Sequence, residues 1–277
     1  MKVTRNCPQG LLNTGISGCP IDFAFVVAAI LVTKGTKLPA DLSAEDLTEL
    51  CHADRPDRVM PIKGLVEYAK NGGEAQTSAV GYGPSQYTGL SQQTDTFSLS
   101  KFIPELHASI LKAVNQEFGV YFVDKDNHII GTNDGTDLLA PIDVTLVPNA
   151  TPFRTSSAQS VQTVGFNYVD TEYVHKHYDY IQADFDVVGA LVGLVEVELV
   201  SVTGGYKLVE HIGGYDRTAE FGTLIAANVS DVLDGATAGS YSNGILTLTV
   251  GTGVVPSLKA PSALYAKGIE GIVQYEA

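Results

Sequence analysis

The segment FGVYFVDKDNHIIG, residues 118–131, gathers residue types that bind cations or transfer protons. Asp124, Asp126, Asn127 and His128 lie close together between two apolar runs. An EF-hand calcium loop needs oxygen ligands at alternate positions, a central glycine and a closing glutamate, whereas His128 and two isoleucines follow here. Asp and Asn also favour tight turns, because their side chains bond nearby backbone groups. We expect a β-hairpin tip, with a bound cation sharing oxygens from the TNDGTD loop as the alternative.

The segment YVHKHYDY contains His175 and His177, two positions apart. On a β-strand these side chains would project from the same face and could bind one metal ion. Cupin sites carry such a pair with a glutamate a few residues on, but here Asp179 follows and no glutamate is near. We therefore expect an exposed or interfacial strand rich in Tyr and His, and metal binding by His175 and His177 is the alternative. Apart from this pair, no metal or cofactor is expected.

Sequence motifs of known catalytic sites are absent. The chain lacks GxSxG, a phosphate-binding GxxxxGK[ST] loop and a strand-GxGxxG-helix unit. Cys51 and His52 are adjacent, but sequence neighbours rarely face each other, and Cys51 fits the apolar stripe of a helix. The carboxylates of the β-rich half read as a solvated or lumen-facing surface. We therefore expect a protein that is not an enzyme.

Composition narrows the class of protein further. Hydrophobic residues make up 44% of the 277 residues and charged residues 17%, below the usual quarter or so. This balance predicts a buried core and a surface partly covered by other subunits. The net charge of −14 would repel phosphate backbones, so no nucleic-acid binding is expected. The longest apolar run, residues 23–32, is too short to span a bilayer as a helix, so no membrane insertion is expected.

The three cysteines, Cys7, Cys19 and Cys51, are an odd number without a CxxC pair. Such a set argues against a disulfide framework and against a four-cysteine zinc site. Reduced thiols are expected, and a bridge between Cys7 and Cys19 stays open.

The first half of the chain mixes predicted helices with a long loop. Ser43 and Asp46 have capping-box spacing and start a short helix. Residues 61–70 predict a second helix, which begins with a proline and ends at Asn71-Gly72-Gly73. Residues 81–96 are polar, glycine-rich and aperiodic, which indicates a long loop or arm. The longest amphipathic helix is predicted over 101–117, with the following residues on one stripe: Phe102, Leu106, Ile110, Ala113, Val114 and Phe118.

The rest of the chain alternates apolar and polar residues. Ile142, Val144 and Leu146 predict one face of a strand, and Asn243-Gly244 predicts a hairpin turn. The expected fold is α+β and mainly β: a sandwich or open barrel with one packed amphipathic helix and a helical N-terminal part. We place a core domain at 1–205, with a clasping arm around 81–96, and a β-sandwich-like domain at 206–277.

Together these features resemble a tailed-bacteriophage virion protein, and a tail-tube subunit more than a capsid shell. The helix at 101–117 is similar to the single helix that packs on the tail-tube sandwich, and the arm is like the loops that clasp neighbouring subunits. The segment 206–277, rich in Thr, Gly and Val, is similar to the immunoglobulin-like modules appended to many virion proteins. Acidity also suits a tube lumen through which DNA slides.

The resemblance implies a self-assembling structural protein of the virion, a tail-tube or other tail or neck subunit assembled in the host cytoplasm. Its partners would be copies of itself, in a ring or tube, and other virion proteins. The alternative is a surface adhesion or glycan-binding module of a phage or bacterium. Under the first hypothesis, the candidate residues of the oligomer interface are Tyr82, Tyr87 and Tyr178.

Overall fold

The computed structural model describes residues 2–4, 23–149, 153–156 and 160–276, so Cys7 and Cys19 lie outside the described residues. The chain divides into two compact units: unit 1 comprises residues 1–47 and 59–191, and unit 2 comprises 48–58 and 192–277. Strands hold 42% of the described residues and helices 19%, which confirms the predicted mainly β class.

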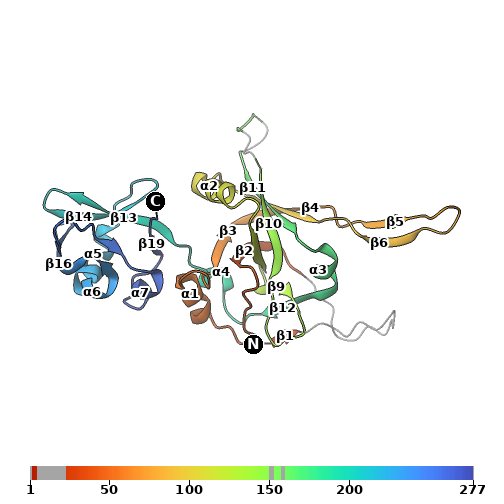
Figure 1. Cartoon of the computed structure of the whole chain (residues 1–277), viewed down its shortest axis with the longest axis horizontal. Coiled ribbons are helices and arrows are strands. Elements are labelled where there is room, and N and C mark those ends of the chain that lie inside the picture. The colour runs from red at the N-terminus through yellow and green to blue at the C-terminus, as the bar shows by residue number, and fades with distance from the viewer. Residues whose placement is uncertain (1, 5–22, 150–152, 157–159, 277) are drawn as a thin grey trace. The chain divides into compact units, whose positions relative to one another are not determined.

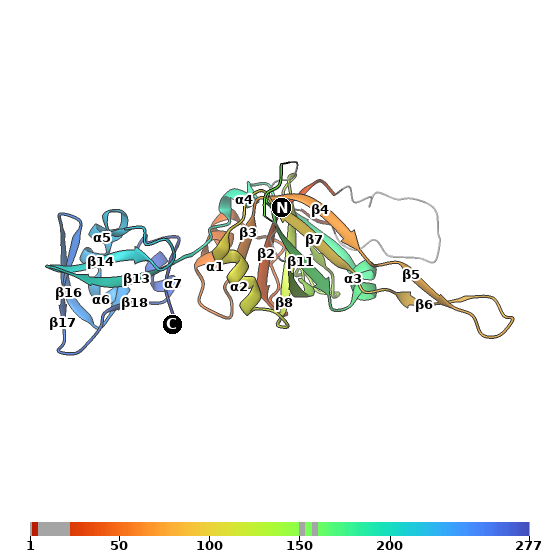
Figure 2. The ribbon, with the colours of Figure 1, turned by 90° about the horizontal axis from the view of Figure 1, so that it is seen from above.

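Unit 1 is built on one ten-stranded sheet that curls into a half-barrel with a sandwich-like arrangement (Figures 1 and 2). The main path runs β1-β12-β9-β8-β10-β11-β7-β4, and β2 pairs with β3 and β8. Its strands are β1 (Lys2–Thr4), β2 (Val26–Thr33), β3 (Met60–Lys63), β4 (Leu65–Asn71), β7 (Thr94–Leu99), β8 (Glu117–Asp124), β9 (His128–Thr132), β10 (Ile142–Pro148), β11 (Gln162–Tyr168) and β12 (Tyr178–Gln182). A separate two-stranded sheet pairs β5 (Ala75–Ser78) with β6 (Gln86–Leu90).

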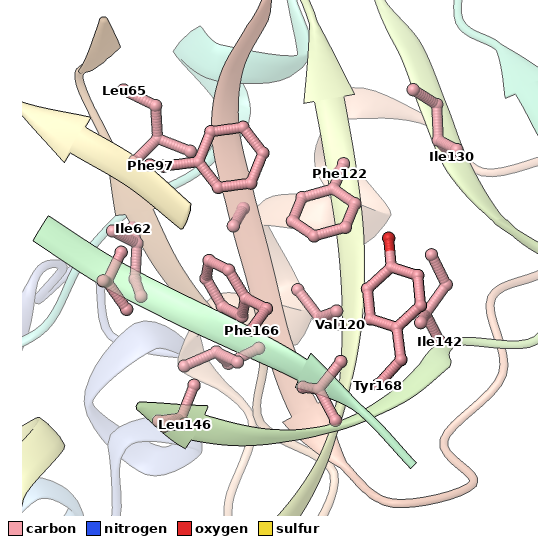
Figure 3. Packing of buried hydrophobic residues seen from close by; sticks show 14 of the residues in the cluster. Ile62, Leu65, Phe97, Val120, Phe122, Ile130, Ile142, Leu146, Phe166 and Tyr168 are labelled. Atoms are coloured by element: carbon pink, nitrogen blue, oxygen red, sulfur yellow. The ribbon is translucent and has the colours of Figure 1, made fainter. Parts of the chain in front are cut away.

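The core of unit 1 lies against the inner face of this sheet. Ile142, Val144 and Leu146 alternate inward on β10, as predicted from the sequence. Phe97, Phe122 and Phe166 stand with ring centroids 5.2–5.9 Å apart at its centre, and Figure 3 shows them between the strands. Tilted and edge-to-face rings at such distances stabilise a core beyond the effect of burial alone.

The helices of unit 1 are short. They are α2 (Pro104–Lys112), α3 (Thr171–His177) and α4 (Val187–Ala190), while α1 (Ala44–His52) crosses from one unit to the other in sequence. The predicted start of α1 is confirmed, since the Ser43 hydroxyl accepts from the Asp46 N–H at 3.1 Å and the Asp46 carboxylate accepts from the Ser43 N–H at 2.9 Å. α2 buries Ile110 and partly buries Leu106 against the core, and its C-cap residue Ala113 packs there too, so one amphipathic helix does pack on the β-sheet of unit 1.

Unit 2 contains a five-stranded sheet, a two-stranded sheet of β15 and β18, and helices that pack on the larger sheet. The order of the larger sheet is β16-β17-β14-β13-β19, and β13 and β19 run parallel. Its elements are β13 (Val195–Val202), β14 (Gly205–Glu210), α5 (Thr218–Ala227), α6 (Val229–Val232), β15 (Leu233–Asp234), β16 (Ala236–Ser242), β17 (Ile245–Val250), β18 (Ser257–Leu258), α7 (Pro261–Tyr265) and β19 (Ile272–Gln274). The predicted Asn243-Gly244 turn is confirmed between β16 and β17, where both residues have positive φ.

Residues 48–58 belong to unit 2 through contacts at the end of α1. The His52 ring stacks on Tyr265 at 4.5 Å, and its Nε2 accepts from the Gly271 N–H at 2.9 Å. Cys51 is buried, and its sulfur accepts from the Val192 N–H. The predicted place of Cys51 inside its helix is therefore confirmed, and both Cys51 and His52 form hydrogen bonds within unit 2.

Two predicted helices are corrected by the structure. Residues 61–70 form strands β3 and β4, separated by Gly64, because β2 and β7 offer ladders on which these residues pair. The helix predicted over 101–117 is shorter, since α2 ends at Lys112. Phe118 therefore belongs to β8, not to the apolar stripe of the helix.

The predicted domain boundary and the second domain also differ from the structure. A boundary at 205/206 would fall inside the β13–β14 hairpin, whose strands pair from Val197↔Glu210 to Val202↔Gly205, and the division lies at 191/192. The immunoglobulin-like domain predicted for 206–277 is not confirmed in the described residues. Helices α5 and α6, carrying Phe221, Ile225 and Val229, pack where a second sheet would lie.

Candidate functional site

The acidic stretch at 124–128 is a hairpin tip between β8 and β9, as predicted. The strands pair Phe122 with Ile130, and Asn127 has a φ of 63°, the left-handed conformation that a tight turn uses. Asp124 is fully buried, and its carboxylate accepts from the backbone N–H of His128 at 2.9 Å and from its Nδ1 at 2.7 Å. It also accepts from the Asp126 N–H at 3.0 Å. Protein donors therefore surround this carboxylate. This arrangement favours the interpretation of the segment as a hairpin turn over its interpretation as a cation-binding site.

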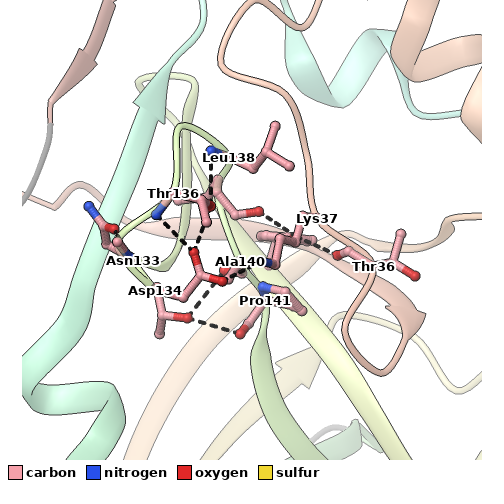
Figure 4. Close-up of polar contacts among 12 residues, drawn as sticks. Thr36, Lys37, Asn133, Asp134, Thr136, Leu138, Ala140 and Pro141 are labelled. Atoms are coloured by element: carbon pink, nitrogen blue, oxygen red, sulfur yellow. Dashed lines mark hydrogen bonds and ion pairs between the residues drawn. The ribbon is translucent and has the colours of Figure 1, made fainter.

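In the neighbouring TNDGTD loop, side-chain oxygens of Asn133 and Asp134 also accept hydrogen bonds from protein groups (Figure 4). Asp134 forms an ion pair with Lys37 and accepts from the Thr136 hydroxyl at 2.7 Å. The Lys37 ammonium is the main cause that lowers the pKa of Asp134 to about 2, so this carboxylate is ionised across the physiological range. The Asn133 amide donates to Asp179 at 3.0 Å and does not turn towards the hairpin tip.

The two histidines lie on helix α3, not on a strand. The Asp170 carboxylate caps this helix by accepting from the Tyr173 N–H at 2.9 Å. Positions two apart on a helix point to different sides, so His175 and His177 do not form a chelating pair. His175 Nε2 bonds Gln93 Oε1 at 2.7 Å, whereas His177 stacks on Tyr173. In the part of the chain that the structure describes, no group of three His, Cys, Asp or Glu side chains could hold a metal ion.

The most exposed element of unit 1 is the hairpin formed by β5, β6 and their turn, residues 75–90, which we call the arm. It extends beyond β4 and β7 and away from the half-barrel (Figures 1 and 2). Every residue from 74 to 88 is exposed, and Gly89 and Leu90 at the end of β6 are half-buried. An isolated two-stranded hairpin with no buried face has marginal stability in water. The arm is therefore a segment that a partner could stabilise.

The arm exposes aromatic and apolar side chains and carries no charge. Val80 is 83% exposed, Tyr82 at the turn is fully exposed, and Tyr87 on β6 is 55% exposed. No Asp, Glu, Lys, Arg or His occurs from Ala75 to Thr94, although the chain as a whole has a net charge of −14. Exposed tyrosines on a segment that carries no charge of its own are typical of protein contact surfaces, because interfaces are enriched in aromatic residues and depleted of charged ones.

A buried polar cluster lies where the arm joins the rest of unit 1, which we call the body. The Asp95 carboxylate accepts from the hydroxyls of Tyr168 at 2.5 Å and Tyr68 at 3.0 Å, and from the side-chain amide of Gln93 at 2.8 Å. Gln93 is 2% exposed and Asp95 is 5% exposed. Burial, with the nearby negative charge of Asp95, raises the pKa of Tyr68 and of Tyr168, so both hydroxyls remain protonated donors. Because each member has a partner, the cluster can hold strands β4, β7 and β11 together.

The three tyrosines proposed as interface residues have different positions. Tyr82 and Tyr87 lie on the exposed arm. Tyr178 lies on β12 and packs against the core of unit 1, with its hydroxyl 3.5 Å from that of Tyr168 and its ring edge-to-face with His175. Burial raises the pKa of Tyr178. Tyr178 is thus a part of the body, while the other two remain candidates for an interface.

Gln93 and Asp95 were not among the functional candidates predicted from the sequence. The segment TDTFSL alternates, and its buried side contains Asp95, Phe97 and Leu99. A carboxylate on the apolar side of an alternating strand is a signal for a buried polar cluster, because an unpaired charge would be costly there. The arm itself was expected around 81–96 as an aperiodic loop, and it is instead a paired hairpin over 75–90.

Neither a protein-family model nor a curated protein sequence matches the chain. Of the helices in the described ranges, none is long and apolar enough to cross a membrane. Function is therefore inferred from the arm and from the β body that carries it.

Proposed function

We propose that the chain is a self-assembling structural protein of a tailed-phage virion, a tail-tube or other tail or neck subunit. Copies of the chain would join through the arm, in a ring or tube, during assembly in the host cytoplasm. The observation that carries the proposal is the arm, an uncharged hairpin whose side chains are all exposed from Gln76 to Thr88. The mainly β body with α2 packed on it is a second point of similarity with tail-tube subunits.

Electrostatics favours an uncharged contact element in this chain. Two copies with a net charge of −14 each repel one another, and the repulsion is strongest where acidic surfaces meet. An arm without charge brings apolar and aromatic surface to a neighbouring copy without adding like charges to the interface. Burial of Val80, Tyr82 and Tyr87 in that contact would supply the hydrophobic and aromatic anchors that dominate interface energies.

The edge of the large sheet offers a second contact element. β4 ends the strand order of unit 1, and only its first residue, Leu65, is buried. Val66 is 62% exposed and Tyr68 is 50% exposed on this edge. An exposed edge strand presents unpaired backbone donors and acceptors to another chain. The edge and the arm are continuous along the sequence, so one neighbouring copy could contact both.

The proposal is tested by deleting the arm while keeping the residue pair at its base. Ala75 and Leu90 are direct partners, so a variant that lacks residues 76–89 can be closed with an inserted Asn-Gly turn. Light scattering after size-exclusion chromatography, over a concentration series, measures the mass of both proteins. We expect discrete oligomers of the 29.3 kDa full chain and monomers of the variant. A full chain that stays monomeric at high concentration, or a variant that assembles equally well, would contradict the proposal.

A matched pair of point variants separates the arm from general surface hydrophobicity. Tyr82→Ser removes an exposed ring from the arm, and Tyr215→Ser removes a ring that is 64% exposed in unit 2. We expect weaker assembly only in the first variant.

A glycan-binding module is the second candidate, which the exposed rings of Tyr82 and Tyr87 favour. Binding of the full chain to a glycan array, lost in Tyr82→Ser, together with a monomeric mass, would support this second candidate instead of the first.

A further inference from the structure

The arm and the body meet at a short break in strand pairing, which we call the joint: residues 72–74 on one chain segment and 91–93 on the other. The β4–β7 ladder ends where Asn71 pairs with Thr94, and the β5–β6 ladder begins where Ala75 pairs with Leu90. Glu74 and Ser91 bridge the joint, because the Ser91 N–H donates to the Glu74 carbonyl at 2.9 Å and the Ser91 hydroxyl accepts from the Glu74 N–H at 3.0 Å. The joint is thus a closed contact between two sheets.

Two glycines make this close approach possible. Gly72 and Gly73 both have a φ of +78°, which side-chain-bearing residues rarely adopt. A Cβ at Gly72 would stand 1.9 Å from the Gln92 carbonyl oxygen, and a Cβ at Gly73 would stand 2.7 Å from Gln93 Oε1. The two segments of the joint therefore touch through backbone and through the Gln93 amide.

Residues 92 and 93 are tied to the body. The Gln93 N–H donates to the Thr171 hydroxyl at 2.9 Å, and the Gln93 carbonyl accepts from the Tyr168 N–H at 2.9 Å. The side-chain amide of Gln92 donates to the Tyr168 carbonyl at 3.2 Å. These bonds place one segment of the joint on α3 and β11.

The side chain of Gln93 extends this attachment to β4, the strand that leads into the arm. Its NH₂ group must face the Asp95 carboxylate, which only accepts, so its Oε1 faces His175 and receives the Nε2 proton. Asp95 in turn accepts from the Tyr68 hydroxyl on β4. A continuous chain of hydrogen bonds thus runs from α3 through Gln93 and Asp95 to β4.

We propose that the joint fixes the direction of the arm, and that Gln93 is the positioning residue that holds the arm in one orientation relative to the rest of unit 1. Gln93 touches both segments of the joint and three elements of the body, and it is buried, so its bonds are not exchanged with water. A contact element with a fixed direction loses less freedom on binding than a flexible one, whatever its partner is. The inference concerns a single copy of the chain and does not depend on the proposed assembly.

Hydrogen–deuterium exchange of the monomer, followed by mass spectrometry, tests the proposal. Gln93→Ala removes the central link, and Tyr68→Phe removes only the hydroxyl that ties β4 to Asp95. Tyr82→Phe and Gln86→Ala are matched controls, because both residues are exposed on the arm and make no side-chain hydrogen bond in the described structure. Since bonds to a buried charge are lost, we expect exchange at 71–75 and 91–93 to rise about tenfold or more in both test variants, and by about twofold at most in the controls.

Two results would overturn the proposal. Unchanged exchange at the joint in Tyr68→Phe would show that the hydrogen-bond chain does not hold it. An equal rise over all of unit 1, including β8 and β10, would show that Gln93 and Asp95 serve the body fold and not the arm.

A direct measurement of arm motion distinguishes an arm that Gln93 holds in place from an arm that moves independently of the body. The chain has no tryptophan, so Tyr87→Trp places a single reporter on β6. We expect its fluorescence anisotropy to decay with the tumbling of the whole monomer, and to gain a faster component when Gln93→Ala is added. A fast component of equal amplitude in both proteins would contradict a fixed arm.

Discussion

Substitution of Gly72 by alanine provides a quantitative test of the joint, with Gly81 as its matched control. Both glycines have positive φ, at +78° and +61°. A left-handed conformation costs alanine about 1–2 kcal/mol at either position. At Gly81, in the turn of the arm, an added Cβ meets nothing within 4 Å, so the conformational term should be the whole cost.

At Gly72 a steric term is added. The new Cβ would stand 1.9 Å from a backbone oxygen, that of Gln92, so the two segments of the joint must move apart. Forcing an extra carbon into a packed site typically costs a further 1–3 kcal/mol, so we expect about 2–5 kcal/mol in total for Gly72→Ala. Hydrogen exchange in a urea series measures the free energy of opening at 71–75 and 91–93. An equal loss for Gly72→Ala and Gly81→Ala would refute the close packing of the joint.

Three other predictions concern the body. Ser43→Ala should destabilise the start of α1 by about 1 kcal/mol, because Asp46 loses its capping partner, as measured by exchange of the first-turn amides. Phe166→Ala should lower the free energy of unfolding of unit 1 by about 3–5 kcal/mol in urea denaturation, because a fully buried ring is lost from the aromatic cluster. Burial, followed by the nearby charge of Lys70, lowers the pKa of His175 in the folded state below 6.5, so the unfolded state binds more protons and unit 1 should lose stability as the pH falls through about 6.5. His175→Gln should reduce that pH dependence in urea titrations at pH 7.5 and 5, and an unchanged dependence would contradict the assignment.

Much of the local structure could be predicted from the sequence where turn and cap chemistry is specific. Asp and Asn at 124–127 identified a hairpin tip, because their side chains satisfy turn amides, and Asp124 does so. Asn243-Gly244 likewise identified the turn of the β16–β17 hairpin. The capping box at Ser43 identified the start of α1. In each place a few neighbouring residues fix the conformation by themselves.

Elements whose conformation depends on distant partners could not be predicted in the same way. Residues 61–70 have a spacing compatible with a helix, but β2 and β7 pair with them, and sheet pairing decided the outcome. Phe118 was assigned to the apolar stripe of the preceding helix for the same reason, but it lies in β8 and pairs with β2 and β10. The joint depends on residues brought together from β4, β7, β11 and α3, so its hydrogen bonds had no local pattern.

The sequence contained capping and periodicity signals for helices α3, α5 and α6, but the composition of the surrounding segments favoured strands. Asp170 caps α3, and an N-cap residue before TEYVHKH favours a helix over the strand that was expected for the two histidines. In unit 2, Phe221, Ile225 and Val229 recur at helical spacing, which identifies α5 and α6 within a segment that was expected to be entirely β. Helix capping at Asp170 and helical spacing in α5 and α6 are therefore the local signals that predict these helices.

Negative-stain electron microscopy of the purified full chain and of the variant that lacks residues 76–89 tests the central claim most directly. We expect closed rings or tubes of the full chain at high concentration, and separate particles of monomer size for the variant under the same conditions. Isolated monomers of the full chain, or identical rings from both proteins, would contradict the claim that the arm joins copies of this protein.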